Sequence, residues 1–321
     1  MGNRRNHFFL IIQLAAIILM NFNLNPVMAQ IYPKFTKITG EYFGQIPPGS
    51  KPELFAPGII STDKKELNSV FTVDGDEFFF SIQTPGEGYS IWSSKKLNDI
   101  WQSPKIVTFS SSQSDVDMCI SHDGRRLFFS SARDINGIEQ DNYKIWYVDK
   151  RINRWGNAKY LDSPINDAEL AMYPTVSNNG TMFFQSIRKD SYGGRDIYYS
   201  KLINGDYAEP IHLDEQINSK FSEGDVLIAP DESFIIVNSV GRPDAIGGGD
   251  LYISFKQING TWSKLKNMGS TINTTGHDYC PMLSPDGKYF FYTSTIAGSE
   301  DIYWVDSKII MSLKPDYLAK E

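Results

Sequence analysis

The stretch Leu283-Ser284-Pro285-Asp286-Gly287, followed by the run Tyr289-Phe290-Phe291-Tyr292, decides the fold of this chain. An Asp-Gly or Asn-Gly pair favours a tight hairpin, because both residue types tolerate the positive φ that such a turn requires. The aromatic and apolar residues on either side are typical of strands that are buried on both faces. The stretch therefore predicts one strand, a tight turn and a second strand.

This unit occurs five times. Its turn residues are Asp74, Asp123, Asn179, Asp231 and Asp286, at spacings of 49, 56, 52 and 55 residues. In the fourth repeat Glu232 stands where the other repeats have glycine. A period near 50 with this regularity indicates a repeat architecture.

Each hairpin is followed by a third apolar run, and four of the five by a fourth. The third runs contain Ile91, Ile145, Ile197, Leu251 and Ile302, and the fourth runs begin with Trp101, Trp155, Tyr207 and Trp262. Four strands in each repeat predict an all-β fold, a five-bladed β-propeller of four-stranded antiparallel blades.

The fifth repeat lacks its fourth strand, and residues 51–57, before the first hairpin, resemble the end of one. We therefore expect this N-terminal strand to complete the last blade and close the ring, which leaves no free blade edge inside it. The expected propeller covers residues 50–308, after a lead segment at 30–49 and before a tail at 309–321.

The repeat motif also resembles a known family. Ser284-Pro285-Asp286-Gly287, the Phe-Phe-type strand after it, and Asp301-Ile302-Tyr303 are similar to the WD40-like repeat of TolB and related bacterial envelope proteins. The resemblance covers about residues 50–305 and is strongest in the fifth repeat. It implies a propeller of the cell envelope.

Residues 1–29 have the three parts of a secretory signal peptide. Arg4 and Arg5 precede an apolar run from Phe8 to Met20, and Val27-Met28-Ala29 forms a small-residue cleavage signal. The run is too short to span a bilayer, which needs roughly 20 residues. We expect an exported protein, periplasmic or extracellular, with no transmembrane segment in the mature chain.

The charge of the chain limits its partners. The net charge is −7, and removal of two arginines with the leader lowers it to −9. An acidic surface repels phosphate backbones, so nucleic acid is excluded as a partner. The expected partner is an envelope protein or a glycan, bound by a monomer.

The sequence contains no catalytic or metal-binding motif. A serine-hydrolase elbow, zinc-ligand spacing, a phosphate loop and a dinucleotide fingerprint are all missing, so we predict no catalytic residues, no metal ligands and no cofactor. Among the mature histidines, His122 belongs to a turn, His212 to an outer strand that faces solvent, and His277 to a blade entrance. His277 is therefore the one histidine predicted near a pocket.

One set of carboxylates recurs eight residues before the turn residues: Glu66, Asp115, Glu223 and Asp278, with Ala171 in the third repeat. Asp117 and Asp225 follow two residues later, on the same face if the strand has begun. These acids and His277 form a candidate ligand site at the channel mouth. They could bind a sugar or a calcium ion, which we do not favour, or catalyse glycosidic acid–base chemistry. We favour a structural role, in which each acid accepts backbone N–H groups of its own blade loop.

Two functions follow. The first is a non-enzymatic module that binds a protein or a glycan. The alternative is a secreted carbohydrate-active enzyme, a glycoside hydrolase or lyase that uses carboxylates at the channel mouth. A fold hosts many functions, so the choice depends on the site.

The leader generates the first testable prediction. We expect cleavage after Ala29 and a mature N-terminus at Gln30, because the small residues Val27 and Ala29 match the pattern that signal peptidases cut. Mass spectrometry of the exported protein measures the terminus. A mature fraction that begins at Met1 contradicts the prediction.

Overall fold

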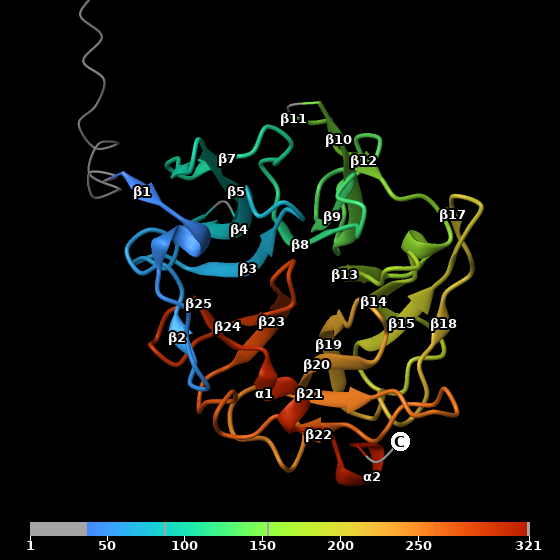
Figure 1. The fold of residues 1–321 in the computed structure, drawn as a ribbon. Helices are drawn as coiled ribbons and strands as arrows, with labels where there is room; N and C mark the ends of the chain where they lie inside the picture. Colours follow the sequence, from blue (N-terminus) through green and yellow to red (C-terminus); the bar gives the residue numbers. More distant parts are fainter. Residues whose placement is uncertain (1–36, 87, 153, 320–321) are drawn as a thin grey trace, which may run out of the picture. The chain divides into compact units, whose positions relative to one another are not determined.

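The computed structural model describes residues 37–86, 88–152 and 154–319, so the predicted leader lies outside the described residues. Five antiparallel sheets follow one another along the chain, from the blue to the red part of Figure 1. The inner strands contact one another in succession, and β23 contacts β3, so the ring of inner strands is closed. The described residues therefore form the predicted five-bladed β-propeller.

Each blade runs outward from an inner strand. Blade 1 contains β3 (Glu66–Phe71), β4 (Glu77–Thr84), β5 (Gly88–Leu97) and β7 (Lys105–Ile106). Blade 2 contains β8 (Asp115–Ile120), β9 (Arg126–Ser131), β10 (Lys144–Arg151) and β12 (Lys159–Tyr160). Blade 3 contains β13 (Leu170–Val176), β14 (Met182–Ile187), β15 (Asp196–Ser200) and β18 (Ile211–His212). Blade 4 contains β19 (Ser222–Ile228), β20 (Phe234–Val240), β21 (Asp250–Phe255) and β22 (Lys266–Asn267).

Blade 5 is completed from the other end of the chain. It contains β23 (Asp278–Leu283), β24 (Tyr289–Ser294), β25 (Asp301–Asp306) and β2 (Glu53–Leu54). β2 pairs antiparallel with β25, with Leu54 opposite Tyr303, and the Phe55 N–H donates to the Ile302 carbonyl at 2.8 Å. The predicted closure of the ring is confirmed.

The turn chemistry explains why the hairpins form. Each turn residue accepts, through its side chain, the N–H two residues ahead, at 2.9 to 3.2 Å. The next residue adopts positive φ, for example 70° at Gly287. Glu232 adopts φ 60° without being glycine, and its carboxylate binds Lys256 at 2.8 Å and Asn179 at 2.9 Å. These contacts offset the strain that the missing glycine creates.

A second recurring contact ties each third strand to the chain that leads into the next blade. Asn218 accepts from the Ile197 N–H at 2.7 Å and donates to the Ile197 carbonyl at 2.9 Å, as a neighbouring strand does. The same position, four or five residues before an inner strand, holds Ser61, Ser110, Asn166 and Asn273, and each binds an apolar residue near the start of a third strand. We call these five residues the clasp residues.

The segments at both ends of the described chain pack on the propeller. β1 (Ile38–Thr39) pairs with β6 (Ile100–Trp101), and the ring of Phe43, within η2 (Glu41–Gly44), stacks on Trp101 at 4.1 Å. At the other end, α1 (Lys308–Ser312) and α2 (Asp316–Ala319) place Ile310 and Leu318 in the core. Neither segment was expected to take part in the fold, because each is short and lies outside the repeat.

The remaining elements lie in the segments that connect the strands of the blades. They are β11 (Arg154–Trp155), the hairpin β16 (Leu202–Ile203) and β17 (Asp206–Tyr207), and η3 (Ile165–Asp167). None of the helices that the structure describes is long and apolar enough to cross a membrane.

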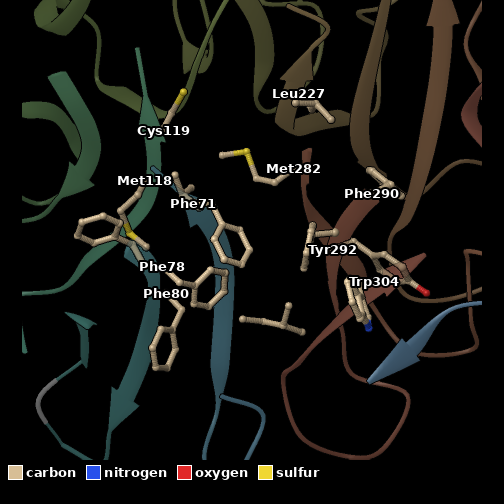
Figure 2. Packing of buried hydrophobic residues seen from close by; sticks show 14 of the residues in the cluster. Phe71, Phe78, Phe80, Met118, Cys119, Leu227, Met282, Phe290, Tyr292 and Trp304 are labelled. Atoms are coloured by element: carbon tan, nitrogen blue, oxygen red, sulfur yellow. The ribbon is translucent and has the colours of Figure 1, made fainter. Parts of the chain in front are cut away.

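Aromatic packing holds the closing strand in place. Phe55 is fully buried, and its ring centroid lies 5.1 Å from Phe291, 5.2 Å from Trp304 and 5.3 Å from Phe78. Figure 2 shows Phe78 and Trp304 on the two sides of this core region. These residues belong to blades 1 and 5, so Phe55 joins the first blade to the last.

This packing predicts a large cost for Phe55→Ala. Removal of a buried phenylalanine costs about 3–5 kcal/mol, which for a chain of this size lowers the melting temperature by on the order of 10 °C. A thermal melt followed by circular dichroism measures the change. Ile46→Ala, in the same segment but with 84% of its surface exposed, is the control and should leave the melt unchanged. Equal melting curves for both variants would show that the ring closes without Phe55.

Candidate functional site

The four recurring carboxylates, which we call the loop carboxylates, are held inside the loops that lead into their own blades. Glu66, Asp115, Glu223 and Asp278 have no exposed surface, and each accepts the backbone N–H of the residue four positions earlier. That residue is Ser or Thr in every case, and its hydroxyl binds the same carboxylate. The contacts are those of the favoured structural role.

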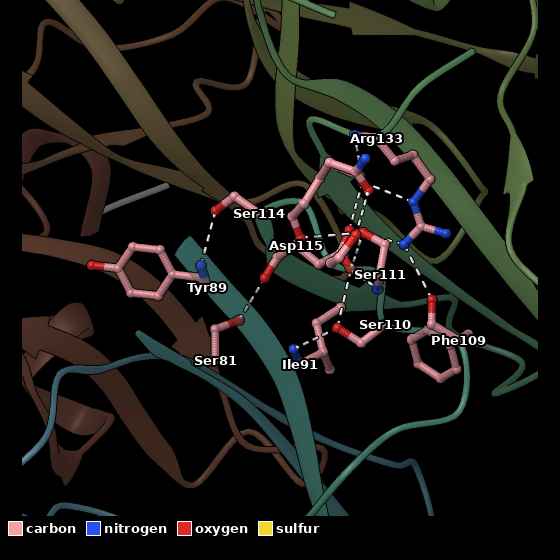
Figure 3. A network of polar contacts seen from close by, with 12 residues as sticks. Ser81, Tyr89, Ile91, Phe109, Ser110, Ser111, Ser114, Asp115 and Arg133 are labelled. Carbon is pink, nitrogen blue, oxygen red and sulfur yellow. Dashed lines mark hydrogen bonds and ion pairs between the residues drawn. The ribbon is translucent and has the colours of Figure 1, made fainter. Parts of the chain in front are cut away.

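Asp115 illustrates the arrangement (Figure 3). It accepts the Ser111 N–H at 2.5 Å and the Ser110 hydroxyl at 3.0 Å, and it pairs with Arg133 at 2.8 Å. Glu223 has an equivalent pair with Arg242 at 2.8 Å. Every oxygen of Asp115 therefore has partners within its blade, and none is directed to a ligand.

Glu66 and Asp278 have Thr partners but no ion pair among the described residues. Burial raises the pKa of Glu66 to about 7, although hydrogen bonds from Thr62 oppose the shift. Burial also raises the pKa of Asp278, against hydrogen bonds from Ser294 and Thr274. The loop carboxylates thus share one geometry, and in blades 2 and 4 an arginine side chain also pairs with the carboxylate.

Each inner strand contains a β-bulge two residues after the loop carboxylate position. The register shifts in all five blades, and the first bulged residue has positive φ. These residues are Asn68 (58°), Asp117 (57°), Tyr173 (52°), Asp225 (43°) and Cys280 (53°). We call them the bulge residues. None is glycine, so each costs of order 1–3 kcal/mol, and such strain is concentrated at functional sites.

The bulge corrects one part of the sequence prediction. Alternation along a regular strand places residues two apart on the same face, which is why Asp115 and Asp117 were grouped into one site. The left-handed residue interrupts that alternation. Asp115 is enclosed in its loop, whereas Asp117 lines a cavity at the centre of the ring, and the same division separates Glu223 from Asp225.

This cavity, which we call the mouth pocket, has a volume of about 250 Å³. Its polar lining includes Asp117, Gln185, Arg195, Asp225, Asn238 and His277, and three tyrosines, Tyr89, Tyr143 and Tyr279, contribute rings. Of the seven predicted site residues, three therefore line one pocket and four do not. Sequence reasoning missed Gln185, Arg195 and the tyrosines, which have no counterpart in every repeat. Gln185 lies on a second strand, Tyr89 on a third strand and Tyr279 on an inner strand, while Arg195 and Tyr143 directly precede third strands.

The two carboxylates of the mouth pocket affect each other. Burial, and then the charge of Asp225, raises the pKa of Asp117 well above its usual range, while Ser130 and Arg195 oppose the shift. Burial raises the pKa of Asp225, against Arg195, a hydrogen bond from Cys280 and His277. The Cys280 N–H donates to Asp225 Oδ2 at 3.2 Å, so the pocket joins blades 2 and 4 to blade 5.

Two glycines admit polar side chains to this pocket. A Cβ on Gly224 would lie 2.2 Å from Gln185 Oε1, and one on Gly249 would lie 2.3 Å from the His277 ring. A side chain at either position would displace Gln185 or His277. These close approaches position both groups at the pocket.

Tyr173 links blade 3 to blade 5 next to the mouth pocket, whose lining includes its chain neighbour Met172. Its ring is fully buried, and its hydroxyl donates to the Pro281 carbonyl at 3.1 Å, from blade 3 to blade 5. A second cavity of about 170 Å³ lies beyond it, lined by apolar residues such as Val70, Ile120 and Leu227. Because Tyr173 and Pro281 lie between residues of the two cavities, we infer that the mouth pocket is a closed-ended site rather than a passage.

Two further predictions concern single residues. The two cysteines of the chain, Cys119 and Cys280, are buried free thiols; two cysteines in a chain of this length had indicated small buried residues rather than a disulfide framework. The prediction that His212 faces solvent is wrong: its Nε2 lies 2.7 Å from the buried carboxylate of Asp196, because the outer strand turns this side chain inward. Among the described residues, no group of three or more His, Cys, Asp and Glu side chains is arranged to hold a metal ion.

The different positions of Asp115 and Asp117 predict opposite effects on stability. For Asp117→Asn we expect a higher melting temperature at pH 7.5. The raised pKa means that the folded state favours neutral Asp117, so its stabilising effect is full below about pH 4 and is lost as the pH rises through the folded-state pKa. The gain from the variant should therefore vanish near pH 4. Asparagine suits this backbone, as Asn68 shows at the equivalent position.

The matched control is Asp115→Asn, two residues earlier on the same strand. It removes the partner of Arg133 and an acceptor of buried N–H and O–H groups, so we expect a loss of about 1–3 kcal/mol at pH 7.5. Asp278→Ala should act in the same direction. Melting temperatures that shift the same way for positions 115 and 117 would contradict the division between loop and pocket.

The comparisons with known proteins identify the fold. No protein-family model matches the chain, and no curated protein matches its sequence. A solved structure of a TolB protein from Agrobacterium tumefaciens matches at a TM-score of 0.50 and 17% identity, over 76% of this chain and 78% of that one. A solved structure described as "Glycoside hydrolase" matches at a TM-score of 0.53 and 14% identity, over 91% of this chain and 96% of that one. At these identities the likeness shows a fold alone, and that fold is the β-propeller that the repeat predicted.

Proposed function

We propose that this chain is an exported, non-enzymatic binding module of the cell envelope, whose mouth pocket holds one polar group of a glycan or a protein. The leader sequence supports export, to the periplasm or the outside of the cell. The observation that carries the proposal is the variety of the bulge residues. These five equivalent, strained positions hold Asn, Asp, Tyr, Asp and Cys. Residues that build the blades recur, so the variation marks positions free to serve a ligand.

The pocket geometry favours binding over catalysis. The volume of about 250 Å³ corresponds to roughly eight water molecules at 30 Å³ each, about one sugar ring. A glycosidase must flank a bond that has a sugar on each side, with both carboxylates in reach of it. Asp225 is already bound by the Cys280 N–H, which leaves less of it available for proton transfer.

The second candidate, a carbohydrate-active enzyme, rests on a specific observation. Asp117 and Asp225 line one pocket and both have raised pKa values, which is a common property of catalytic acids. In that case Asp117, which accepts no backbone N–H comparable to that of Cys280 on Asp225, serves as the general acid. The likeness to a solved glycoside hydrolase structure is compatible with this function but extends only to the fold.

A panel of defined glycans distinguishes the two functions. We expect the wild-type protein to retain a subset of the glycans without releasing shorter products, and Asp117→Asn to weaken retention at least tenfold. Binding is measured on immobilised glycans and product release by chromatography after long incubation. Glu209→Gln, an exposed carboxylate outside the pocket, is the control. Product that forms with the wild type and is abolished in Asp117→Asn and Asp225→Asn would establish the enzyme instead.

A further inference from the structure

The unpaired atoms of the mouth pocket are all of one kind. Asp117 is 5% exposed and Gln185 is fully buried, and both line the pocket. Asp117 Oδ2 and Gln185 Oε1 have no hydrogen-bond partner among the described residues. The Gln185 amide nitrogen donates to Asp225 Oδ1 at 3.4 Å, which turns its oxygen away from that carboxylate. Both unpaired atoms are acceptors, and a buried acceptor without a partner is costly.

The charges of the pocket point in the same direction. The pocket contains two carboxyl groups, from Asp117 and Asp225, and one guanidinium, from Arg195. At the rim, Glu300 accepts the Tyr89 hydroxyl at 2.5 Å and adds to the negative potential. The raised pKa of Asp117 means that the empty pocket favours its neutral form. A monovalent cation with N–H donors allows Asp117 to release its proton to water and supplies both the balancing charge and the hydrogen bonds.

We propose that the mouth pocket recognises the primary ammonium group of an unacetylated amino sugar in a glycan. The ammonium donates to Asp117 Oδ2 and Gln185 Oε1, and its charge balances the carboxylate pair. The rings of Tyr143 and Tyr279 offer apolar surface to one face of the sugar, while Arg195 donates to a hydroxyl. This inference rests on the proposed function and names the ligand class of the same site.

A divalent metal ion fits the pocket less well. Calcium prefers six to eight oxygen ligands, often from several carboxylates. The mouth pocket offers two carboxylates beside the guanidinium of Arg195, and a divalent ion would leave a net positive charge there. A lysine side chain of a partner protein carries the same ammonium group, but its narrow aliphatic chain would leave the faces of the tyrosine rings uncovered.

The test uses three oligosaccharides with the same linkage and a different group at one carbon: chitosan tetraose (ammonium), chitin tetraose (acetamide) and cellotetraose (hydroxyl). Calorimetry on the full mature chain at pH 6.5 and 150 mM salt measures affinity. We expect chitosan tetraose to bind at least tenfold more tightly than the other two. Asp117→Asn should abolish that preference while it keeps a melting temperature at or above that of the wild type. Glu209→Gln, which removes one exposed charge elsewhere, should keep the preference.

Four results would overturn the inference. Equal binding of all three sugars leaves the proposed glycan-binding function standing but removes the ammonium. If none of the three sugars binds while the fold is intact, this class of sugar is not the ligand of the pocket. Equal or tighter binding of Nα-acetyl-lysine methylamide would assign the pocket to a protein side chain. A melting temperature raised by calcium chloride in the wild type and not in Asp117→Asn would assign it to a metal ion.

Discussion

The structure depends on the hydrogen bonds that each clasp residue makes to a third strand. A propeller chain must travel from the rim of one blade back to the centre of the next, and this return segment has no strand partner of its own. Asn166, Asn218 and Asn273 supply one, because an amide side chain offers the donor and acceptor of a peptide group. The Ser61 hydroxyl also both accepts and donates, whereas the Ser110 hydroxyl accepts the Ile91 N–H and donates to Asp115. Five residues after the clasp residue, the loop carboxylate fixes the entry to the inner strand, except in blade 3, where Ala171 replaces it.

Once the loops are fixed, the inner strands can carry strain. The loop carboxylate and the bulge residue are only two positions apart, yet one stabilises its blade and the other faces the centre of the ring. Cross-blade hydrogen bonds compensate for part of the cost: the Tyr173 N–H donates to Ser130 at 2.9 Å, and the Asn68 N–H to Thr293 at 3.2 Å. The bulge gives every blade one inward side chain whose identity the blade does not require. Tyr173 uses this freedom to link blade 3 to blade 5, and Asp117 and Asp225 use it to line the mouth pocket.

Much of this architecture could be predicted from local chemistry. The Asp-Gly turns, the aromatic strands and the aromatic residue four positions before each outer strand are short-range signals, and they repeat. The closing strand at Glu53–Leu54 could be predicted because a ring with a missing strand needs one. The site could be predicted only in part. Recurrence drew attention to Glu66, Asp115, Glu223 and Asp278, but recurrence is a property of residues that build blades. Gln185 and Arg195 each occur in a single repeat and gave no signal.

The sequence by itself determined the repeat, the number of blades, the turn at each anchor and the need for an N-terminal strand, because these follow from backbone preferences within a few residues. Only the tertiary structure decided which carboxylates face a ligand. A single left-handed residue in each inner strand breaks the two-residue alternation, and no pattern of hydrophobicity records it. Proximity across the ring then decided the chemistry: Asp117 and Asp225 are 108 positions apart in the chain. Their charges act on one another because the closed ring brings blades 2 and 4 to the same small, poorly hydrated pocket.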